Sequence, residues 1–349
     1  MTAKTAAPGA GKIMVLGAGK IMVLGAGAWG TALAQALAKE GRAVALCARE
    51  AALAAEINGA RENKTYLPGI ALSPAVAATA DLAAAALDAD IVLLATPTQF
   101  ARTAMRALKP HLSPAALVVN CAKGIEIENG KLLFEAAAET LPGQPYAVLS
   151  GPTFAAEVAQ GLPAAVTFAT RAAPEEAARA ARTLSTKTFR LYLSSDVTGA
   201  EIAGAVKNVI AIACGIVEGK NLGLNARAAV MTRGIAEMKR LGLKRGADAE
   251  TFLGLSGIGD LALTCNATAS RNFSLGLALG RGQKLANVLA ARRSVAEGVA
   301  TARAIAVNAR TFGVEMPICA AVDGILHQNA DIDRVIAGLM ERDLKEENI

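Results

Sequence analysis

A short apolar segment followed by a glycine-rich turn, near the N-terminus, restricts the possible folds of this chain more than any other feature. Residues 21–24 (IMVL) are predicted to form a strand, and Gly25, Gly27 and Gly30 follow at the spacing G-x-G-x-x-G. The next residues, TALAQALAKE, are mostly strong helix formers. A strand, three glycines and a helix in this order are typical of the first βαβ unit of a dinucleotide-binding sheet.

Each of the three glycines has a predicted role. Gly25 allows the tight turn, Gly27 lets the backbone approach a pyrophosphate, and Gly30 lets the helix pack closely on the strand. The pyrophosphate is expected at the helix N-terminus, where unpaired N–H groups and the helix dipole favour an anion. The alternative interpretation is a glycine turn without a ligand.

A tandem duplication precedes this turn. The octapeptide KIMVLGAG occupies residues 12–19 and again residues 20–27. Met22 stands where the first copy would need its third glycine, so only the second copy completes the motif. We therefore expect residues 1–19 to be a tail plus a surplus copy. Because Lys20 interrupts the apolar run, the segment does not resemble a secretory signal.

The residues after the second predicted strand bear on the choice of cofactor. An acidic side chain there would bind the ribose 2′-hydroxyl of NAD, whereas an arginine can pair with the 2′-phosphate of NADP. The strand ends in Cys47-Ala48-Arg49-Glu50. Arg49 favours NADP and Glu50 is compatible with NAD, so we expect either NADP or NAD. The alternative for Arg49 is an ordinary solvated arginine.

The remaining pattern predicts two domains of different architecture. Short apolar runs alternate with alanine-rich helical segments up to about residue 195, and only helical periodicity follows residue 198. This pattern predicts an α/β protein with an N-terminal Rossmann-type doubly wound sheet and an all-helical C-terminal domain. The expected strands cover residues 21–24, 43–47, 91–95, 116–120, 146–150, 164–168 and 189–193. The expected helices cover residues 29–40, 50–58, 81–87, 98–108, 129–140 and 174–185. The expected domains are a dinucleotide-binding domain at 20–196 and a substrate-binding domain at 197–349.

Composition excludes several other classes of protein. Lys and Arg exceed Asp and Glu by six but are scattered, and only 3% of residues are aromatic, so nucleic acid is not an expected partner. No uncharged apolar run of membrane-spanning length occurs, so no transmembrane segment is expected. The five cysteines lie far apart without a CxxC pair or a neighbouring histidine, which argues against disulfides and a metal site. Reduced thiols in the cytoplasm are the expected state.

A proton donor other than histidine is needed if the chain is an oxidoreductase. The two histidines, His111 and His327, lie outside any motif-like surroundings. Lys207 is the single charge in the apolar helical stretch GAVKNVIAIACGI, an unusual setting unless the charge is functional or paired. Burial or a neighbouring cation can lower the pKa of a lysine toward neutrality. Lys207 is therefore the candidate catalytic residue, and a structural lysine at a helix edge is the alternative.

Seven segments together resemble one known family. They are GAGAWGTALA (25–34), CAKGIE (121–126), SGPTFAAEVAQGLP (150–163), GAVKNVIAIACGI (204–216), GLSGIGDLALTC (254–265), SRN (270–272) and VAEGVATA (295–302). With these motifs in this order, the chain from Lys20 onward resembles the bacterial NAD(P)-dependent glycerol-3-phosphate dehydrogenases. The resemblance implies interconversion of dihydroxyacetone phosphate and sn-glycerol 3-phosphate by hydride transfer, which supplies the glycerol backbone of phospholipids. A phosphorylated small molecule is the implied partner, and a homodimer remains an open alternative to a monomer.

The resemblance also implies roles for individual residues, with Lys207 as the general acid and base. The implied substrate-binding residues are Lys123, Gly151, Thr153, Lys207, Asp260, Ser270, Arg271 and Asn272. The implied cofactor-binding residues are Gly25, Gly27, Ala28, Trp29, Gly30, Arg49, Lys123, Ala155, Arg271, Val295 and Glu297. Members of the family often have serine at the position of Ala28, so a side-chain contact to the phosphates is expected to be lost. The guanidinium of Arg271 matches the need of a phosphate dianion for a cationic partner.

Two other functions remain open at this point. The first is a different dehydrogenase with the same domain plan, such as a hydroxyacid or ketopantoate reductase. That hypothesis does not account for the SRN triplet or for the loop that contains Asp260. The second is a non-catalytic sensor that binds NAD(P), and it gives Lys207 no role.

Overall fold

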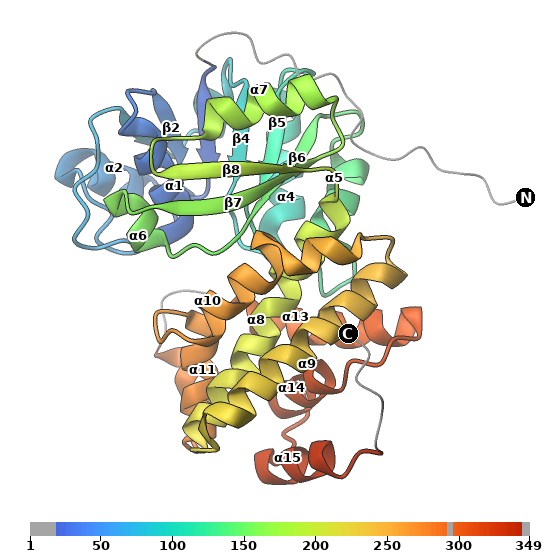
Figure 1. Ribbon diagram of the computed structural model, residues 1–349. Helices are drawn as coiled ribbons and strands as arrows, with labels where there is room; N and C mark the ends of the chain where they lie inside the picture. Colours follow the sequence, from blue (N-terminus) through green and yellow to red (C-terminus); the bar gives the residue numbers. More distant parts are fainter. Residues whose placement is uncertain (1–18, 292–295, 344–349) are drawn as a thin grey trace, which may run out of the picture. The chain divides into compact units, whose positions relative to one another are not determined.

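An eight-stranded sheet forms the core of the N-terminal half of the computed structural model, which describes residues 19–291 and 296–343 (Figure 1). The strands are β1 (Ile21–Leu24), β2 (Val44–Cys47), β3 (Val76–Thr79), β4 (Ile91–Leu94), β5 (Leu117–Asn120), β6 (Tyr146–Ser150), β7 (Ala164–Thr170) and β8 (Phe189–Ser194). Their order across the sheet is β3-β2-β1-β4-β5-β6-β7-β8. Strands β1 to β6 pair in parallel, as do β7 and β8. The predicted doubly wound sheet is therefore confirmed.

Strand β1 is central to the sheet and is built from the second copy of the duplicated octapeptide. Ile21 pairs with Val44 of β2 on one side and with Ile91 of β4 on the other. The chain builds the sheet outward from β1 to β3 and then returns to place β4 beside β1, so the strand order reverses there. Ligands of such sheets bind beyond the carboxyl ends of the strands at this reversal. The glycine turn that follows Leu24 starts at this position.

Helices cover both faces of the sheet. They are α1 (Ala28–Ala38), α2 (Ala51–Ala60), α3 (Leu82–Ala86), α4 (Thr98–Leu108), α5 (Leu133–Thr140), α6 (Ala155–Gln160) and α7 (Pro174–Leu184). Ile21 and Val23 pack in one apolar cluster with Leu33 of α1. Met22 and Leu24 point to the opposite face, because successive side chains of a strand alternate, and they are equally buried. Burial on both faces explains why β1 is an uninterrupted apolar run.

Three differences from the predicted elements have local causes. Strand β3 was missed because its sequence, VAAT, is half alanine and carries little β-forming signal. Helix α6 was missed because it has only six residues; its C-cap Gly161 has a φ of +89° and ends it. The helix expected from residue 129 begins instead at Leu133, since Gly130 adopts a φ of +69° and turns the preceding chain.

The chain divides into two compact units that do not follow the sequence strictly. Unit 1 contains the segments up to Ala122, Leu133–Leu149 and Thr153–Val197. Unit 2 contains Lys123–Leu132, Ser150–Pro152 and the chain from Thr198 onward. Two short segments that follow strands of the sheet therefore belong to unit 2. Lys123 and Gly151 lie in these segments.

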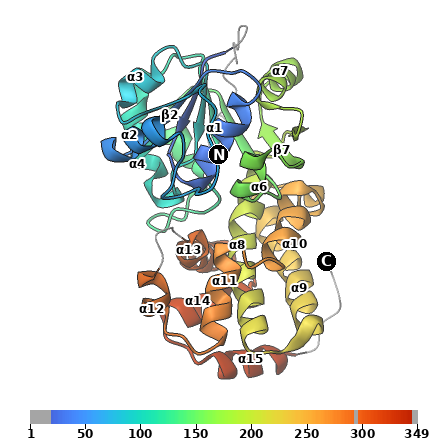
Figure 2. The ribbon, with the colours of Figure 1, turned by 90° about the vertical axis from the view of Figure 1, so that its left-hand side faces the viewer.

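Helices alone follow β8 in the described residues, as expected for the C-terminal half (Figure 2). They are α8 (Val197–Gly219), α9 (Gly223–Lys244), α10 (Asp260–Cys265), α11 (Arg271–Gly280), α12 (Leu285–Ala290), α13 (Glu297–Phe312), α14 (Pro317–His327) and α15 (Ile332–Met340). Helix α8 is long and apolar enough to cross a membrane, but its most apolar window is wholly buried within the protein. It therefore has the burial of a core helix.

Glycines let α8 and α11 approach until their backbones touch. A Cβ atom added at Gly215 of α8 would lie 2.1 Å from the carbonyl oxygen of Phe273, and one at Gly276 of α11 would lie 2.0 Å from that of Ile212. One turn further along, Gly219 and Gly280 face each other in the same way. No larger residue fits at these positions without moving one helix away from the other.

Candidate active site

The glycine turn after β1 has the geometry that its sequence predicts. Gly25 has a φ of +116°, and a Cβ atom there would lie 2.9 Å from the carbonyl carbon of Ala95. A Cβ atom at Gly30 would lie 1.9 Å from the carbonyl oxygen of Gly25. At Gly27 the corresponding space is open: apart from its neighbours in the chain, no heavy atom of residues 19–291 and 296–343 lies within 4 Å. Gly25 and Gly30 are thus required by packing within the protein, whereas Gly27 leaves room for another molecule.

The start of helix α1 can accept an anion. Gly27 is its N-cap, no side chain caps its first N–H groups, and its first turn contains no acidic residue. Uncapped N–H groups and the helix dipole attract a negatively charged group. Together with the open space at Gly27, these features fit the pyrophosphate of a nicotinamide dinucleotide. Ala28 and Trp29 open the helix, and the Trp29 ring contacts Phe189 edge-on at a centroid distance of 6.4 Å.

Arg49 and Glu50 lie just beyond the carboxyl end of β2. The Nη2 atom of Arg49 lies 2.5 Å from Oε1 of Glu50, and Nε donates to the same oxygen at 3.0 Å. The Arg49 side chain is 86% exposed. A guanidinium that is accessible and a carboxylate beside it can recognise a 2′-phosphate and a 2′-hydroxyl respectively. The pair is therefore compatible with both NADP and NAD.

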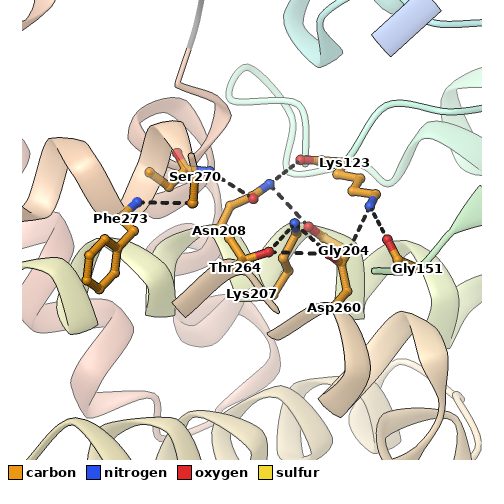
Figure 3. Close-up of polar contacts among 10 residues, drawn as sticks. Lys123, Gly151, Gly204, Lys207, Asn208, Asp260, Thr264, Ser270 and Phe273 are labelled. Carbon is orange, nitrogen blue, oxygen red and sulfur yellow. Dashed lines mark hydrogen bonds and ion pairs between the residues drawn. The ribbon is translucent and has the colours of Figure 1, made fainter. Parts of the chain in front are cut away.

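A buried carboxylate between two lysines forms a second candidate centre, in unit 2 (Figure 3). Asp260 Oδ1 accepts a hydrogen bond from Lys207 Nζ at 2.9 Å, and Oδ2 accepts one from Lys123 Nζ at 2.6 Å. Lys207 also donates to Thr264 Oγ1 at 2.8 Å, and Lys123 donates to the Gly151 carbonyl oxygen at 2.9 Å. With both lysines protonated, the three ionised groups carry a net charge of +1. This charge suits an anionic substrate.

The elements that carry these side chains explain how they meet. Lys207 projects from the buried helix α8, whereas Asp260 and Thr264 lie four residues apart on one face of α10. Gly204, one turn before Lys207 in α8, leaves space for the side chain of Lys123. A Cβ atom at Gly204 would lie 3.3 Å from Cγ of Lys123 and 3.1 Å from Oγ of Ser150.

Burial and the neighbouring charges shift the pKa of Lys207 and the pKa of Asp260. Burial lowers the pKa of Lys207 to about 8; Asp260 opposes this shift and Lys123 adds to it. Burial alone would raise the pKa of Asp260, but the ammonium groups of Lys123 and Lys207 outweigh it and hold the pKa below its ordinary value. At neutral pH, Asp260 is therefore ionised and Lys207 is a proton donor whose pKa lies close to the ambient pH.

A chain of amide hydrogen bonds links this centre to two further helices. Asn208 Nδ2 donates to the Lys123 carbonyl oxygen at 2.9 Å, and Asn272 Nδ2 donates to Asn208 Oδ1 at 2.8 Å. The backbone N–H of Gly298, in the first turn of α13, donates to Asn272 Oδ1 at 3.1 Å. The chain thus connects the Lys123 backbone with α8, α11 and α13.

Some of the predicted substrate-binding residues are linked by hydrogen bonds, and others lie at the start of helix α11. Hydrogen bonds link Gly151 to Lys123, Lys123 to Asp260 and Asp260 to Lys207. Asn272 joins this group through Asn208, which binds the Lys123 carbonyl oxygen. Ser270 caps α11 by accepting the N–H of Phe273 at 3.2 Å, and Arg271 is the exposed first residue of that helix.

The other predicted residues are located as follows. Thr153 and Ala155 belong to unit 1; Thr153 lies two residues before α6 and Ala155 is its first residue. Glu297 begins α13. Val295 lies outside the described residues. Sequence reasoning missed Thr264 and Asn208 as members of the lysine centre. Two sequence signals could have identified them. Thr264 lies four residues after Asp260, on the same face of a helix, and Asn208 is adjacent to Lys207.

Two family models match the chain, one over each half. Residues 20–176 match the model described as the N-terminus of NAD-dependent glycerol-3-phosphate dehydrogenase. Residues 196–337 match the model of the C-terminus of the same family.

Individual relatives agree with these matches. The chain is 55% identical over 321 residues to a Caulobacter vibrioides protein named glycerol-3-phosphate dehydrogenase, NAD(P)+, covering 92% of this chain and 96% of the relative. A Parvibaculum lavamentivorans protein of the same name is 53% identical with the same coverage. Among solved structures, glycerol-3-phosphate dehydrogenase from Coxiella burnetii matches with a TM-score of 0.89 and 37% identity, covering 93% of this chain and 99% of that structure.

Proposed function

The chain belongs to the NAD-dependent glycerol-3-phosphate dehydrogenase family, and from that premise we propose which of its residues carry the reaction. The enzyme interconverts dihydroxyacetone phosphate and sn-glycerol 3-phosphate with NAD(P) as the cofactor. The reaction supplies the glycerol backbone of phospholipids. Neither alternative function, a dehydrogenase of another small acid or a sensor without turnover, agrees with the family assignment of both halves of the chain.

Lys207 is the proposed proton donor to the carbonyl oxygen of dihydroxyacetone phosphate, and it removes the same proton in the reverse direction. The single observation that carries this proposal is its buried ammonium at 2.9 Å from Asp260, with a pKa of about 8. Lys123 supplies a second ammonium, so that both cations offset the negative charge that develops on the oxygen during reduction. Asp260 fixes the direction of both ammonium groups through one oxygen each.

The proposed phosphate-binding residues are grouped around the start of α11. The guanidinium of Arg271 can form paired hydrogen bonds with a phosphate. Ser270 uses its oxygen to accept the Phe273 N–H, so its hydroxyl proton remains able to reach the phosphate. Asn272 uses one of its two N–H groups for Asn208, and the second N–H is the one proposed to bind the phosphate. Gly151 and Thr153 complete the proposed substrate contacts.

The proposed cofactor contacts start from the glycine turn. They are Gly25, Gly27, Ala28, Trp29, Gly30 and Arg49, together with Lys123, Ala155, Arg271, Val295 and Glu297. When bound, the nicotinamide supplies or receives the hydride. In this proposal residues 20–196 form the dinucleotide-binding domain and residues 197–349 the substrate-binding domain.

Two substitutions of Lys207 test its role. Lys207→Met removes the charge and the proton, whereas Lys207→Arg keeps the charge on a group that does not release its proton near neutral pH. Both variants should lose about 10²–10⁴-fold in kcat for NADPH oxidation with dihydroxyacetone phosphate, because a general acid contributes about that factor. Near-normal turnover in Lys207→Arg would show that the proton comes from elsewhere, with Lys123 the next candidate.

A matched control lies at the end of the same helix. Lys220 directly follows the last residue of α8, pairs with Asp333 at 2.6 Å and is not among the proposed site residues. Lys220→Met should turn over like the unmodified enzyme. NADPH affinity should be little changed in all three variants.

The assembly and the location are further proposals. A homodimer is proposed because unit 2 exposes large apolar side chains, among them Leu224 at 68% and Leu253 at 65%, which a second copy could cover. Sedimentation velocity of the full chain tests it, and a purely monomeric species would exclude it. A cytoplasmic location is proposed because all five cysteines are buried thiols that form no disulfide. Fractionation of the producing cell tests this location.

A further inference from the structure

Asn63, which lies shortly after helix α2, has its side chain directed at the glycine turn. The side chain has no exposed surface. Its Nδ2 atom donates to the carbonyl oxygen of Ala26 at 2.9 Å and to Oγ1 of Thr31 at 2.8 Å. Both N–H groups of the amide are therefore used, and both bind the segment that contains Gly25, Gly27 and Gly30.

Asn63 is itself held firmly in place. Its Oδ1 atom accepts the N–H of Tyr66 at 3.1 Å, and its carbonyl oxygen accepts the N–H of Leu67 at 2.8 Å. The preceding helix, α2, ends at Ala60, and its C-cap Arg61 has a φ of +51°, which turns the chain. All hydrogen bonds of the Asn63 amide form only in one orientation, with Nδ2 toward the glycine turn and Oδ1 toward the Tyr66 N–H.

The bond to Ala26 sets the direction of a neighbouring donor. The carbonyl of Ala26 and the N–H of Gly27 belong to the same peptide unit, which is trans, since no cis peptide bond occurs among the described residues. In a planar trans peptide the C=O and N–H groups point in opposite directions. By holding the Ala26 carbonyl on its own side, Asn63 turns the Gly27 N–H away from itself.

The bond to Thr31 fixes the other side of Gly27. The N–H of Thr31 donates to the Gly27 carbonyl oxygen at 2.9 Å, which is the first hydrogen bond of α1. Asn63 therefore contacts the chain both before and after the N-cap, and it does so from within the protein. The open space at Gly27 stays free of this side chain.

We propose that Asn63 is the positioning residue of the cofactor turn, holding the Ala26–Gly27 peptide so that the Gly27 N–H is directed at the dinucleotide pyrophosphate. The inference rests on the proposed function, because it takes the turn after β1 to be the cofactor site. A purely structural role would predict lost stability without a specific loss of cofactor affinity. Asn63 does not touch the reacting atoms, so its effect should appear in cofactor binding before it appears in kcat.

Two substitutions at position 63 separate geometry from charge. Asn63→Asp keeps the shape but loses both donors and adds a negative charge, whereas Asn63→Leu loses the donors without adding charge. Asn58 provides the matched control, since its amide binds the backbone of Ala78 in β3, at 2.8 Å to the oxygen and 2.9 Å to the nitrogen. Asn58→Asp and Asn58→Leu make the same chemical changes away from the glycine turn.

The measurement is NADPH affinity by quenching of Trp29 fluorescence, with melting temperature and kcat recorded on the same samples. Trp29 is the only tryptophan in the sequence and lies two residues after Gly27, so the signal arises at the turn itself. Both Asn63 variants should bind NADPH about 10- to 100-fold more weakly, as expected for the loss of two hydrogen bonds. Their kcat at saturating NADPH should stay within about threefold of the unmodified value, a margin of under 1 kcal/mol in the barrier.

A milder variant covers the case in which the Asn63 variants fail to fold. Thr31→Val removes one acceptor of the amide and preserves the branched shape, and it should weaken NADPH binding by about 3- to 10-fold. Unchanged affinity in the folded Asn63 variants, or in Thr31→Val, would overturn the proposal. So would losses of affinity as large in the Asn58 variants at equal loss of stability. If NADPH does not quench Trp29 in the unmodified enzyme, the cofactor-site assignment fails instead.

Discussion

Replacing Asp260 with asparagine should move the pH dependence of the enzyme toward acid. The carboxylate raises the pKa of Lys207, whereas burial and Lys123 lower it, and the balance is a pKa of about 8. Asparagine preserves the shape of the side chain but removes the charge. Because an opposite charge at hydrogen-bond distance shifts a pKa by about 1–3 units, the pKa of Lys207 should fall to about 5–7 in this variant.

The change in pKa can be converted into a change in rate. With Lys207 as the proposed proton donor, reduction of the ketone needs its protonated form. The rate of reduction should therefore fall as the pH rises through the pKa, whereas the rate of alcohol oxidation should rise. At pH 7 about 90% of the lysine is protonated for a pKa of 8, against about 10% for a pKa of 6. Asp260→Asn should therefore lose about tenfold in kcat/KM at pH 7 from protonation alone. Near pH 5.5 Lys207 should be mostly protonated in the variant as well as in the unmodified enzyme. Most of the tenfold loss in kcat/KM should therefore be recovered there.

The assay is the pH profile of kcat/KM for dihydroxyacetone phosphate at saturating NADPH, which reports on the enzyme before the substrate binds. The alkaline limb should lie near pH 8 in the unmodified enzyme and about 1–3 units lower in the variant. Asp333→Asn is the control, because Asp333 pairs with Lys220 on the surface. An alkaline limb that stays in place in Asp260→Asn would refute the view that this carboxylate sets the pKa of the proton donor.

Three further predictions concern the phosphate site, the helix contact and the duplicated segment. Arg271→Leu should lower kcat/KM for dihydroxyacetone phosphate far more than kcat/KM for unphosphorylated dihydroxyacetone. Equal losses for the two substrates would show that Arg271 does not bind the phosphate. Gly276→Ala should destabilise the protein by about 1–3 kcal/mol, measured by urea unfolding, because its methyl group would overlap the Ile212 carbonyl oxygen. Deletion of residues 12–19 should leave activity and NADPH affinity unchanged, because β1 is formed by Ile21–Leu24 and the deletion restores Ala-Gly before Lys20. A large loss of activity in the deletion variant would mean that the first copy is needed.

The elements that could be predicted from sequence are those whose signal is local. The glycine spacing after residues 21–24 identified β1 and α1, because the turn requires glycine at particular backbone positions. Lys207 stood out as the single charge in the apolar stretch 204–216, because burying an ammonium costs free energy unless the group is paired or functional. Strand β3, by contrast, is stabilised by its pairing with β2, and the two alanines within it give no sign of that pairing.

The lysine centre could not be assembled from sequence spacing. Asp260 is 53 residues from Lys207 and 137 residues from Lys123, so only the fold brings the three charges together. The resemblance to a family suggested all three residues, and the sequence favoured Asp260 as a partner of Lys207. The structure adds that the same carboxylate also binds Lys123. Asn63 had no signal at all, because a buried asparagine and a solvated loop asparagine look the same in sequence.

The glycine contact between α8 and α11 has a consequence for substrate length. Helix α8 carries Lys207, whereas α11 begins with Arg271, so the two ends of the proposed substrate site stand on two helices whose backbones touch. Side chains between helices can repack to change a spacing, but touching backbones cannot come closer. The contact therefore sets a minimum distance between Lys207, the proposed proton donor, and Arg271, the proposed phosphate ligand. Selection for a longer phosphorylated ketone should accordingly yield changes at Gly215, Gly219, Gly276 or Gly280, rather than in the charged residues themselves.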